Sequence, residues 1–530
     1  MTKKPNIIIF NPDQMRTDSM HHMGNPAAIT PNLDAFAEND AVSYRHAYCQ
    51  NPLCTPSRCS FLTGLYPHVY GHRIISYALH GESTILSELK ESGYHVWMNG
   101  RNDFLPAQEE GVFEKHADVT YFGGGEHPNP PVNPDHRGRP GNPAYYSHYV
   151  GELRIDENGI NYSRDDDSVD EAIRTIRNRP EDKPLCIFLG LMYPHPPYEV
   201  EEPYFSAIDR SKLPPRIQPP EDWSGFPSML RELNKRFGMS GWDEEQFNEL
   251  RACYLGMVMK VDAQFGKLVN TLKQEGIYDD TAIFFFSDHG DFTGDYGVTE
   301  KCPSVLTENL LNVPLLIKPP KGFAVDPGIS DGFAELIDFY ATAAEFSGIT
   351  PDHTHFGRSL CGNIADRSHE TRRYVFSETG RLRGETHCTA ANDVGGVAEE
   401  NIYYPKISLQ ASENMEAMKA TMIRSKKYKF IRRLYEDDEF YDMENDPAQL
   451  HNLIHEQEYS TEIAAMRENM LTWYQETCDV VPFKRDSRIP EHVALERIKR
   501  LGEEQYRKAI ELLDSGMLPQ AVMVKFGEMP

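Results

Sequence analysis

A cysteine and an arginine four residues apart could do chemistry on an anion. Residues 54–64 read CTPSRCSFLTG, in which Pro56 suits the first turn of a helix and Gly64 suits its end. Cys54 beside a helix N-terminus and the Arg58 guanidinium would lie in a field that attracts anions. On local physics alone, a buried and inert small side chain remains an equal alternative for this cysteine.

Three apolar, β-rich runs each end in polar side chains that can bind ligands. The runs are Asn6–Phe10, Leu185–Leu191 and Thr281–Phe286. Runs of this kind are typical of buried parallel strands, and strands that alternate with helical patterns predict an α/β sheet covered on both faces. In such sheets ligands bind at the carboxyl ends of the strands. We therefore expect the residues after these three runs to converge.

Two of these strand ends carry a carboxylate next to a second ligand, Asp13-Gln14 and Asp288-His289. Hard divalent cations prefer carboxylate and amide oxygens, and an imidazole also suits manganese. Either pair alone could equally be a capping carboxylate at a turn. The two pairs together with Cys54 favour a metal site.

Residues 54–64 resemble the signature of the type I sulfatases, Cys-x-Pro-Ser-Arg followed by x-x-x-Leu-Thr-Gly, at every defining position. In that family the cysteine is oxidised to formylglycine (3-oxoalanine), an aldehyde whose hydrate is the nucleophile. The resemblance runs from Asn6 to about Leu453. It implies an alkaline phosphatase-like α/β fold with a large, mostly parallel sheet between helices and a smaller C-terminal subdomain with a short antiparallel sheet.

The resemblance also implies roles for individual residues. The divalent metal, Ca²⁺ first and Mn²⁺ or Mg²⁺ as alternatives, would be held by Asp13, Gln14, Cys54, Asp288 and His289. Arg58 would hold the hydrate, His195 would protonate the leaving oxygen, and Lys301 would grip the sulfate. A formylglycine-generating maturation enzyme is the implied partner.

One family element is altered. Where sulfatases commonly have Gly-Lys-x-His, this chain has GRND at positions 100–103. Arg101 can replace the lysine as a sulfate clamp, because its planar fork suits a tetrahedral anion. Asp103 occupies the histidine position, where it could face a substrate hydroxyl, face a cation, or act as the elimination base. Arg381 and Arg383 could meet a uronate or second sulfate, or form structural ion pairs.

The net charge of the chain limits the classes of partner that it can be expected to bind. Lys and Arg number 54 and Asp and Glu number 81, so the net charge is −27 and excludes nucleic acid or an anionic membrane as the expected partner. Nine irregularly spaced cysteines, no signal-like start and no apolar stretch of membrane-spanning length predict a reduced, cytoplasmic protein.

The chain is predicted to divide into a catalytic domain (1–370), a C-terminal α+β subdomain (371–480) and a helical tail (481–530). Residues 107–158 are rich in Gly, Pro, His and Asn, and predict a substrate-facing insertion with His127, His136 and His148 or a solvated loop. Helices are expected at 244–275, 334–346 and 497–513, and C-terminal strands at 374–377, 427–431 and 439–442. The tail helix would pack on the body or on another subunit of a homo-oligomer.

The resemblance to the type I sulfatases implies hydrolysis of sulfate esters, on a sulfated carbohydrate or another small organosulfate. The Asp-Gln and Asp-His pairs resemble those of choline sulfatases and phosphonate monoester hydrolases, so hydrolysis of phosphonate monoesters or phosphodiesters is the alternative. A catalytically silent protein that binds sulfated ligands is a further one.

Overall fold

The computed structural model describes residues 4–123, 138–140, 142, 144–153, 163–389, 396–411, 417–483 and 485–529. The chain forms two compact units, Met1–Pro351 with His355–Asp479, and Asp352–Thr354 with Val480–Pro530. His127 and His136 lie outside the described residues, and the predicted boundary at 370 stays a prediction.

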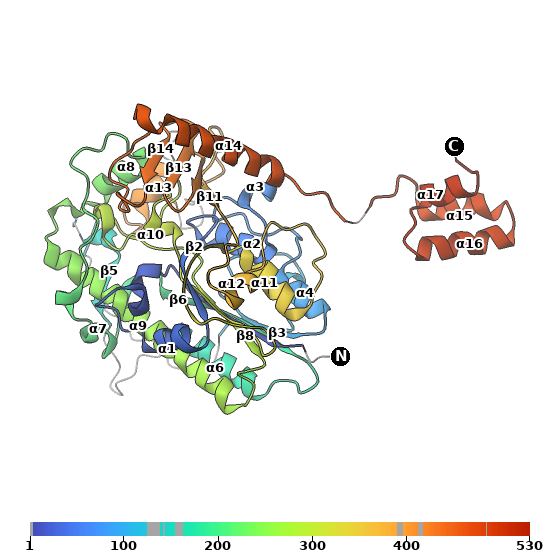
Figure 1. The fold of residues 1–530 in the computed structure, drawn as a ribbon, viewed down its shortest axis with the longest axis horizontal. Helices are drawn as coiled ribbons and strands as arrows, with labels where there is room; N and C mark the ends of the chain where they lie inside the picture. The colour runs from blue at the N-terminus through green and yellow to red at the C-terminus, as the bar shows by residue number, and fades with distance from the viewer. Residues whose placement is uncertain are drawn as a thin grey trace. The chain divides into compact units, whose positions relative to one another are not determined.

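The first unit, part of whose strands are labelled in Figure 1, is built on an eight-stranded sheet. The three predicted apolar strands are neighbours in this sheet. The strand order is β10 (Gly328–Glu335), β2 (Val42–Tyr48), β9 (Leu315–Lys318), β8 (Thr281–Phe286), β1 (Asn6–Asp13), β6 (Leu185–Pro194), β3 (His95–Asn99) and β4 (Val119–Tyr121). All neighbouring pairs are parallel except those of β9, which runs antiparallel to β2 and β8. The expected mostly parallel sheet is therefore confirmed.

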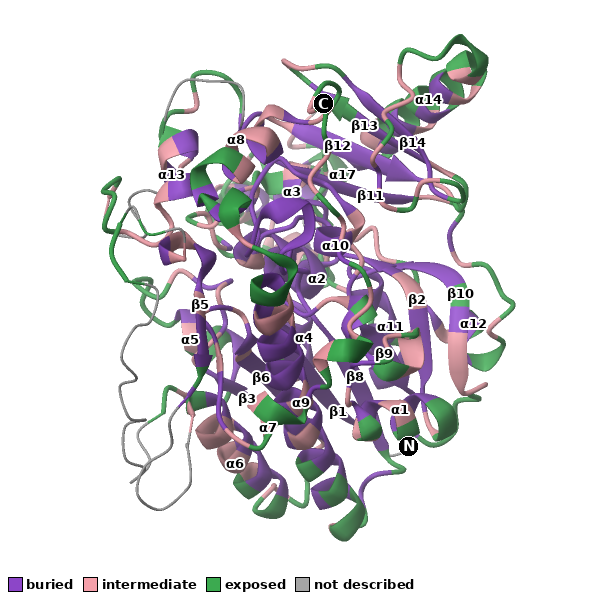
Figure 2. Ribbon diagram, turned by 90° about the vertical axis from the view of Figure 1, so that its left-hand side faces the viewer, coloured by how far each residue is buried: buried purple, intermediate pink, exposed green. Residues whose placement is uncertain are grey.

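Helices cover both faces of this sheet, because successive side chains of the central strands point to opposite sides. Ile8 and Phe10 of β1 pack into one core with α1 (Pro31–Asn39), α6 (Arg164–Arg177) and α9 (Glu244–Gln274). Ile7 and Ile9 pack into the other with α2 (Cys54–Thr63), α4 (Ile85–Glu91) and α11 (Asp338–Ser347). Figure 2 shows the resulting buried central strands between helices whose outer faces are exposed.

The long helix predicted at 244–275 is confirmed as α9, which begins at a capping box formed by Asp243 and Gln246. The helix predicted at 334–346 is wrong at its start. Ala334 and Glu335 are the last residues of β10 and pair with β2, and the helix begins at Asp338, whose carboxylate accepts a hydrogen bond from the Glu335 amide. The run from Ala334 onward fits the periodicity of a strand as well as that of a helix, and pairing with β2 places its first two residues in a strand.

The C-terminal part of the first unit contains an antiparallel sheet of four strands, β11 (Val375–Thr379), β12 (Ala420–Arg424), β13 (Tyr428–Arg433) and β14 (Glu439–Asp442). Helix α14 (Ser460–Thr477) packs on it, with Trp473 and Met470 against Ile423 and Phe430. The short antiparallel sheet predicted here is confirmed.

Shorter elements complete this unit. They are α3 (Pro67–Tyr70), α5 (Val112–His116), α7 (Tyr204–Ala207), α8 (Ser228–Phe237), α10 (Glu308–Leu311), α12 (Cys361–Ala365) and α13 (Tyr404–Ala411). A separate parallel pair joins β5 (Tyr149–Glu152) to β7 (Tyr198–Val200). The described end of the predicted insertion therefore pairs with the strand that follows His195.

The second unit contains three helices, α15 (Glu491–Lys499), α16 (Glu503–Asp514) and α17 (Pro519–Lys525), around a core that includes Ile498, Ala509 and Met523. The single helix predicted at 497–513 is wrong, because Gly502 has a φ of 125° and separates two helices there. Across the described part of the chain, none of the helices is both long and apolar enough to cross a bilayer.

Two glutamates near the junction of the sheets, the buried Glu335 and the half-buried Glu308, should respond differently to pH. Burial raises the pKa of Glu335 to about 7, although its carboxylate pairs with Arg372 at 2.8 Å. Burial also opposes ionisation of Glu308, but Arg424 and Lys429 hold its pKa at about 2. The stability that Glu335 contributes is complete below its ordinary pKa of 4.5 and is lost as pH rises through 7.

We therefore expect Glu335→Gln to gain stability relative to the parent between about pH 5 and about pH 8.5, by on the order of 3 kcal/mol. Glu308→Gln should show a constant difference over that range, because Glu308 is ionised throughout. Thermal unfolding midpoints of the three proteins across pH measure this. Equal pH profiles for the two variants would contradict the raised pKa of Glu335.

Candidate active site

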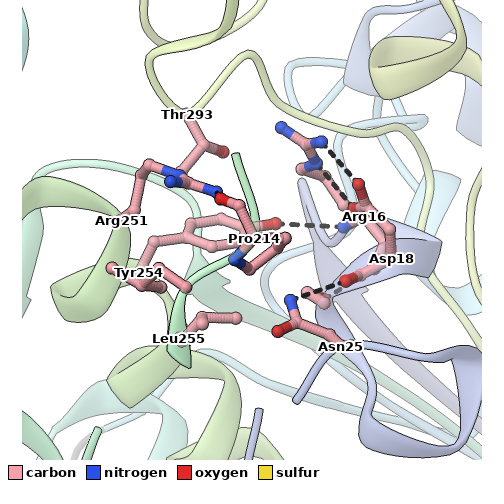
Figure 3. A pocket seen from close by; sticks show the side chains of 10 residues that line it. Arg16, Asp18, Asn25, Pro214, Arg251, Tyr254, Leu255 and Thr293 are labelled. Atoms are coloured by element: carbon pink, nitrogen blue, oxygen red, sulfur yellow. Dashed lines mark hydrogen bonds and ion pairs between the residues drawn. The ribbon is translucent and has the colours of Figure 1, made fainter. Parts of the chain in front are cut away.

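The loop after β1 is held in one conformation by its backbone contacts. Gln14 has a left-handed φ of 69°, and its N–H donates to Asp288 Oδ1 at 3.1 Å. The Tyr254 hydroxyl of α9 donates to the Gln14 carbonyl at 2.9 Å and accepts from the Arg16 N–H at 3.0 Å. Figure 3 shows this tyrosine beside Arg16 in a small pocket next to the loop. The long helix thus fixes the loop that follows Asp13.

The loop after β8 brings Asp288 and His289 to the same edge. Ser57 of α2 donates to the Asp288 carbonyl at 2.6 Å. Nδ1 of His289 lies 3.0 Å from the Gly290 carbonyl, so it carries the proton and leaves the Nε2 lone pair free. Burial lowers the pKa of His289, which keeps the ring neutral. Nε2 lies 3.5 Å from Asp13 Oδ1 and 3.8 Å from Asp288 Oδ1.

This arrangement fits a metal ion. Asp13, Asp288 and His289 are buried and offer ligand atoms within 4.8 Å of one another. Within the described ranges, Asp13 Oδ1 and His289 Nε2 are buried without a hydrogen-bond partner, a costly state that a cation would relieve. Burial alone would raise the pKa of Asp13, but Arg101 and other nearby cations hold it well below its usual range. The carboxylate is therefore ionised.

Helix α2 presents both residues of the cysteine motif. Cys54 is its first residue, and it ends at Gly64, whose φ is 71° and where a Cβ would lie 2.8 Å from His355 Cβ. The Arg58 side chain is fully buried. It donates from Nε to Asp288 Oδ2 and from Nη2 to Asp13 Oδ2, both at 3.0 Å. Arg58 therefore joins the two strand ends.

The Cys54 thiol is a poor nucleophile as it stands. Burial raises its pKa to about 12, with Lys301 opposing the rise and Asp13 and Asp103 adding to it. Its Sγ lies within 4.8 Å of carboxylate oxygens of Asp13 and Asp103. Because the thiolate is the reactive form of cysteine, unmodified Cys54 would be inert at neutral pH.

The altered segment at 100–103 enters the same site. Arg101 Nη2 donates to Asp13 Oδ2 at 2.5 Å. Its backbone approaches β6 so closely that a Cβ on Gly190 would lie 2.3 Å from the Arg101 carbonyl oxygen. Asp103 has a φ of 53°, and its carboxylate lies 3.9 Å from Arg58 Nε and 4.0 Å from Arg101 Nη2. Asp103 therefore faces two cations as well as residue 54.

Lys301 reaches the site from the loop after Asp288. Its Nζ donates to Gln14 Oε1 at 2.7 Å and lies 3.0 Å from Glu300 Oε1. Burial would lower the pKa of Lys301, but Glu300 and other acidic groups raise it above its ordinary value. The amine is therefore a buried cation beside the predicted metal ligand Gln14.

His195 lies just past the end of β6, and its ring is half-buried. Nδ1 lies 2.6 Å from the Pro196 carbonyl and donates to it. Burial holds the pKa of His195 well below its usual value, and the charge of Lys301 adds to this effect. The imidazole is therefore neutral, with Nε2 as the atom that can exchange a proton.

Two predicted substrate residues make contacts elsewhere. The buried Arg381 donates to the carbonyls of Glu385 and Gln410, and the exposed Arg383 lies over the ring of Tyr435 at 4.5 Å. These contacts are hydrogen bonds to backbone carbonyls and a cation–π contact, and a role of either arginine in substrate binding stays a prediction.

The structure adds residues to the site that the sequence did not single out. Asp291, Tyr198, Glu300 and Lys406 are buried beside Gln14 and Lys301. Asp291 and Glu300 could have been suspected from their proximity to Asp288 and Lys301 in sequence. Nothing local marks Tyr198 or Lys406.

Removing His289 should weaken binding of a divalent cation. We expect Ca²⁺ or Mn²⁺ to raise the thermal midpoint of metal-depleted protein, and His289→Ala to lose at least tenfold in cation affinity, because the cluster loses its neutral nitrogen donor. Calorimetric titration gives the affinity. His116→Ala, which removes another buried and neutral imidazole on α5, is the matched control. Equal affinity in the two variants would contradict the assignment.

Comparisons with known proteins agree with this geometry. Residues 5–349 match the sulfatase family profile. The chain is similar to an arylsulfatase from Clostridium perfringens (25% identical over 500 residues, 88% of this chain and 94% of that protein) and to a choline-sulfatase from Rhizobium meliloti (26% over 473 residues, 85% and 83%). A phosphonate monoester hydrolase from Agrobacterium radiobacter superposes with a TM-score of 0.68 at 20% identity, covering 89% of this chain and 96% of that one.

The family profile spans well over half of the chain, and the sheet order, strand-end carboxylates and cysteine-bearing helix lie within it. The protein therefore belongs to the sulfatase family, sulfuric-ester hydrolases with the alkaline phosphatase-like fold.

Proposed function

We propose that this protein hydrolyses sulfate esters at the site formed by Asp13, Cys54, Asp288 and His289, using a divalent cation and a formylglycine made from Cys54. The observation that carries the proposal is the buried cluster with unpaired ligand atoms directly beside residue 54. A thiol with a pKa of about 12 also supports a modified residue at that position.

When present, the cation supplies Lewis acidity and the formylglycine hydrate supplies the nucleophile. Asp13, Asp288, His289 and the amide oxygen of Gln14 would hold the cation. Ca²⁺ is the first expectation, and the imidazole keeps Mn²⁺ open. Arg58 holds Asp13 and Asp288 in register and carries positive charge close to residue 54.

The charges of the site favour a monoanionic ester. Four carboxylates pair with four cations, namely Asp13, Asp103, Asp288 and Glu300 with Arg58, Arg101, Lys301 and Lys406. A fifth carboxylate, Asp291, accepts hydrogen bonds from Gln14, Tyr198 and Thr293. With all five ionised the side chains sum to −1, and a divalent cation would add two positive charges. An entering sulfate ester would offset part of that charge, with Arg101 and Lys301 as its donors.

His195 is the proposed donor to the leaving oxygen. Its pKa is low because the partly buried ring is desolvated and because Lys301 and Arg101 repel a proton. A bound anion would screen those cations and favour protonation at Nε2, so the imidazole would gain its proton when substrate is present.

A sulfated carbohydrate is the proposed substrate class, with choline and other small sulfate esters behind it. Hydrolysis of phosphonate monoesters or phosphodiesters is the second candidate, because these substrates also carry one negative charge. The structural similarity to a phosphonate monoester hydrolase favours keeping it.

A formylglycine-generating enzyme is the proposed maturation partner. All nine cysteines lie in the described ranges and are free thiols. The reducing, cytoplasmic location stays a prediction. Assembly into a homo-oligomer stays a prediction.

Parallel assays should separate the two candidates. Protein from a host that makes formylglycine should hydrolyse 4-nitrophenyl sulfate at least tenfold faster, in kcat/KM, than 4-nitrophenyl phenylphosphonate. Cys54→Ala should abolish both activities, and mass analysis of the peptide containing Cys54 verifies the modification. A dominant phosphonate activity would overturn the sulfatase assignment. An unmodified cysteine in fully active protein would overturn the role of formylglycine.

Asp103 is proposed as the base of the second half-reaction, because its carboxylate lies within 4.8 Å of the residue 54 side chain and can accept a proton from a hydroxyl there. Asp103→Asn should release the alcohol of the first turnover in a burst and slow steady-state turnover at least 100-fold. Rapid-mixing kinetics with an aryl sulfate measure both phases. Asp331→Asn, which removes an exposed carboxylate paired with Arg45, is the control. Equal slowing of both phases by Asp103→Asn would contradict this role.

A further inference from the structure

Gln14 and Lys301 belong to a closed ring of contacts between side chains and backbone. Gln14 Nε2 donates to Asp291 Oδ2 at 2.5 Å, and the Tyr198 hydroxyl donates to the same carboxylate at 2.8 Å. That hydroxyl accepts from the Glu300 N–H at 2.9 Å. Glu300 Oε1 pairs with Lys301 Nζ at 3.0 Å, and Lys301 returns to Gln14 Oε1 at 2.7 Å. We call these five residues the Gln14 ring.

The ring fixes the orientation of the Gln14 amide. A carboxylate only accepts hydrogen bonds, so Asp291 selects the NH₂ side of the amide. An ammonium only donates, so Lys301 selects the oxygen side. The amide oxygen has two lone pairs, of which Lys301 uses one. The second stays available to a cation held by Asp13 and Asp288.

The ring also limits the freedom of Lys301. Its ammonium has three N–H groups, of which Gln14 accepts one, and its charge pairs with Glu300 Oε1 at 3.0 Å. The remaining donors can face a substrate oxygen. A lysine on a flexible stem would otherwise sample many directions, so the ring converts it into a fixed donor.

Two residues hold the ring without belonging to the cation site. The fully buried Tyr198, on β7, joins Asp291 to the backbone of Glu300. Lys406, on α13, contacts the second carboxylate oxygen of Glu300. Glu300 has a left-handed φ of 63°, a conformation that needs such support in a non-glycine residue.

We propose that Tyr198 and Lys406 are positioning residues, which act through Asp291 and Glu300 to aim the Gln14 oxygen at the cation and the free N–H of Lys301 at the substrate anion. This inference rests on the proposed function for its catalytic consequence. Its consequence for cation binding does not depend on which ester is hydrolysed.

Tyr198→Phe tests the proposal because it removes the hydroxyl that joins Asp291 to Glu300 and keeps the aromatic side chain. Loss of an outer contact of this kind typically lowers metal affinity or activity by about 10- to 100-fold. We expect kcat/KM on 4-nitrophenyl sulfate to fall by about that factor, with most of the loss in kcat, and Ca²⁺ or Mn²⁺ affinity in calorimetry to fall at least fivefold.

Tyr340→Phe is the matched control. Tyr340 is also fully buried and donates to a carboxylate, Glu88 Oε1 at 2.6 Å, but lies on α11 outside the Gln14 ring. Both variants should lose thermal stability, and only Tyr198→Phe should lose cation affinity and kcat. If the two variants lose the same stability and neither changes cation affinity or kcat, the role of Tyr198 is structural and the proposal is overturned.

A second pair of variants keeps the test decisive if Tyr198→Phe does not fold. Lys406→Met removes the ammonium group beside Glu300, and Lys406→Arg keeps a positive charge there. We expect Lys406→Met to lower kcat and cation affinity, and Lys406→Arg to recover most of both. Equal defects in the two Lys406 variants would overturn the role of the charge. If the parent protein binds the cation but hydrolyses no sulfate ester, the proposed function fails. The cation titrations of the variants still test whether Tyr198 and Lys406 position Gln14.

Discussion

The buried Arg58 guanidinium is the interaction on which the rest of the site depends. It bonds to Asp13 at the end of β1 and to Asp288 in the loop after β8, two carboxylates that would otherwise repel each other in a dry environment. Removing one partner of a buried ionic group leaves the others uncompensated, at a cost of several kcal/mol. The sheet can end in two adjacent acids only because α2 brings this cation between them.

A balance of charge extends outward from that centre. Arg101 shares Asp13 with Arg58, Asp103 faces both guanidiniums, and Lys301 and Lys406 divide Glu300. Each of these charges therefore has an opposite neighbour, as low-dielectric surroundings require. The proposed divalent cation would give this framework positive character, and an acidic protein of net charge −27 could then attract an anion locally.

The sequence predicted the parts of the fold that follow from strong local patterns. The three apolar strands and the capped helix α9 were confirmed. The three strands are neighbours, so their carboxyl ends lie at one edge of the sheet, as parallel strands require. The boundary at Ala334 and the break at Gly502 were wrong, because strand pairing and a left-handed glycine decide them. Tyr198 and Lys406 could not be predicted, since their contacts join segments whose separation in sequence carries no periodic signal.

Helix α13, which carries Lys406, is synthesised late. Residue 54 and the strand that ends in Asp13 are synthesised early, whereas α13 follows all eight strands of the large sheet. Chains fold progressively as they leave the ribosome. The helix that bears Cys54 is therefore exposed for much of translation, before the C-terminal segments enclose the site. That interval would give the proposed maturation enzyme freer access to a thiol that the finished fold leaves only partly exposed.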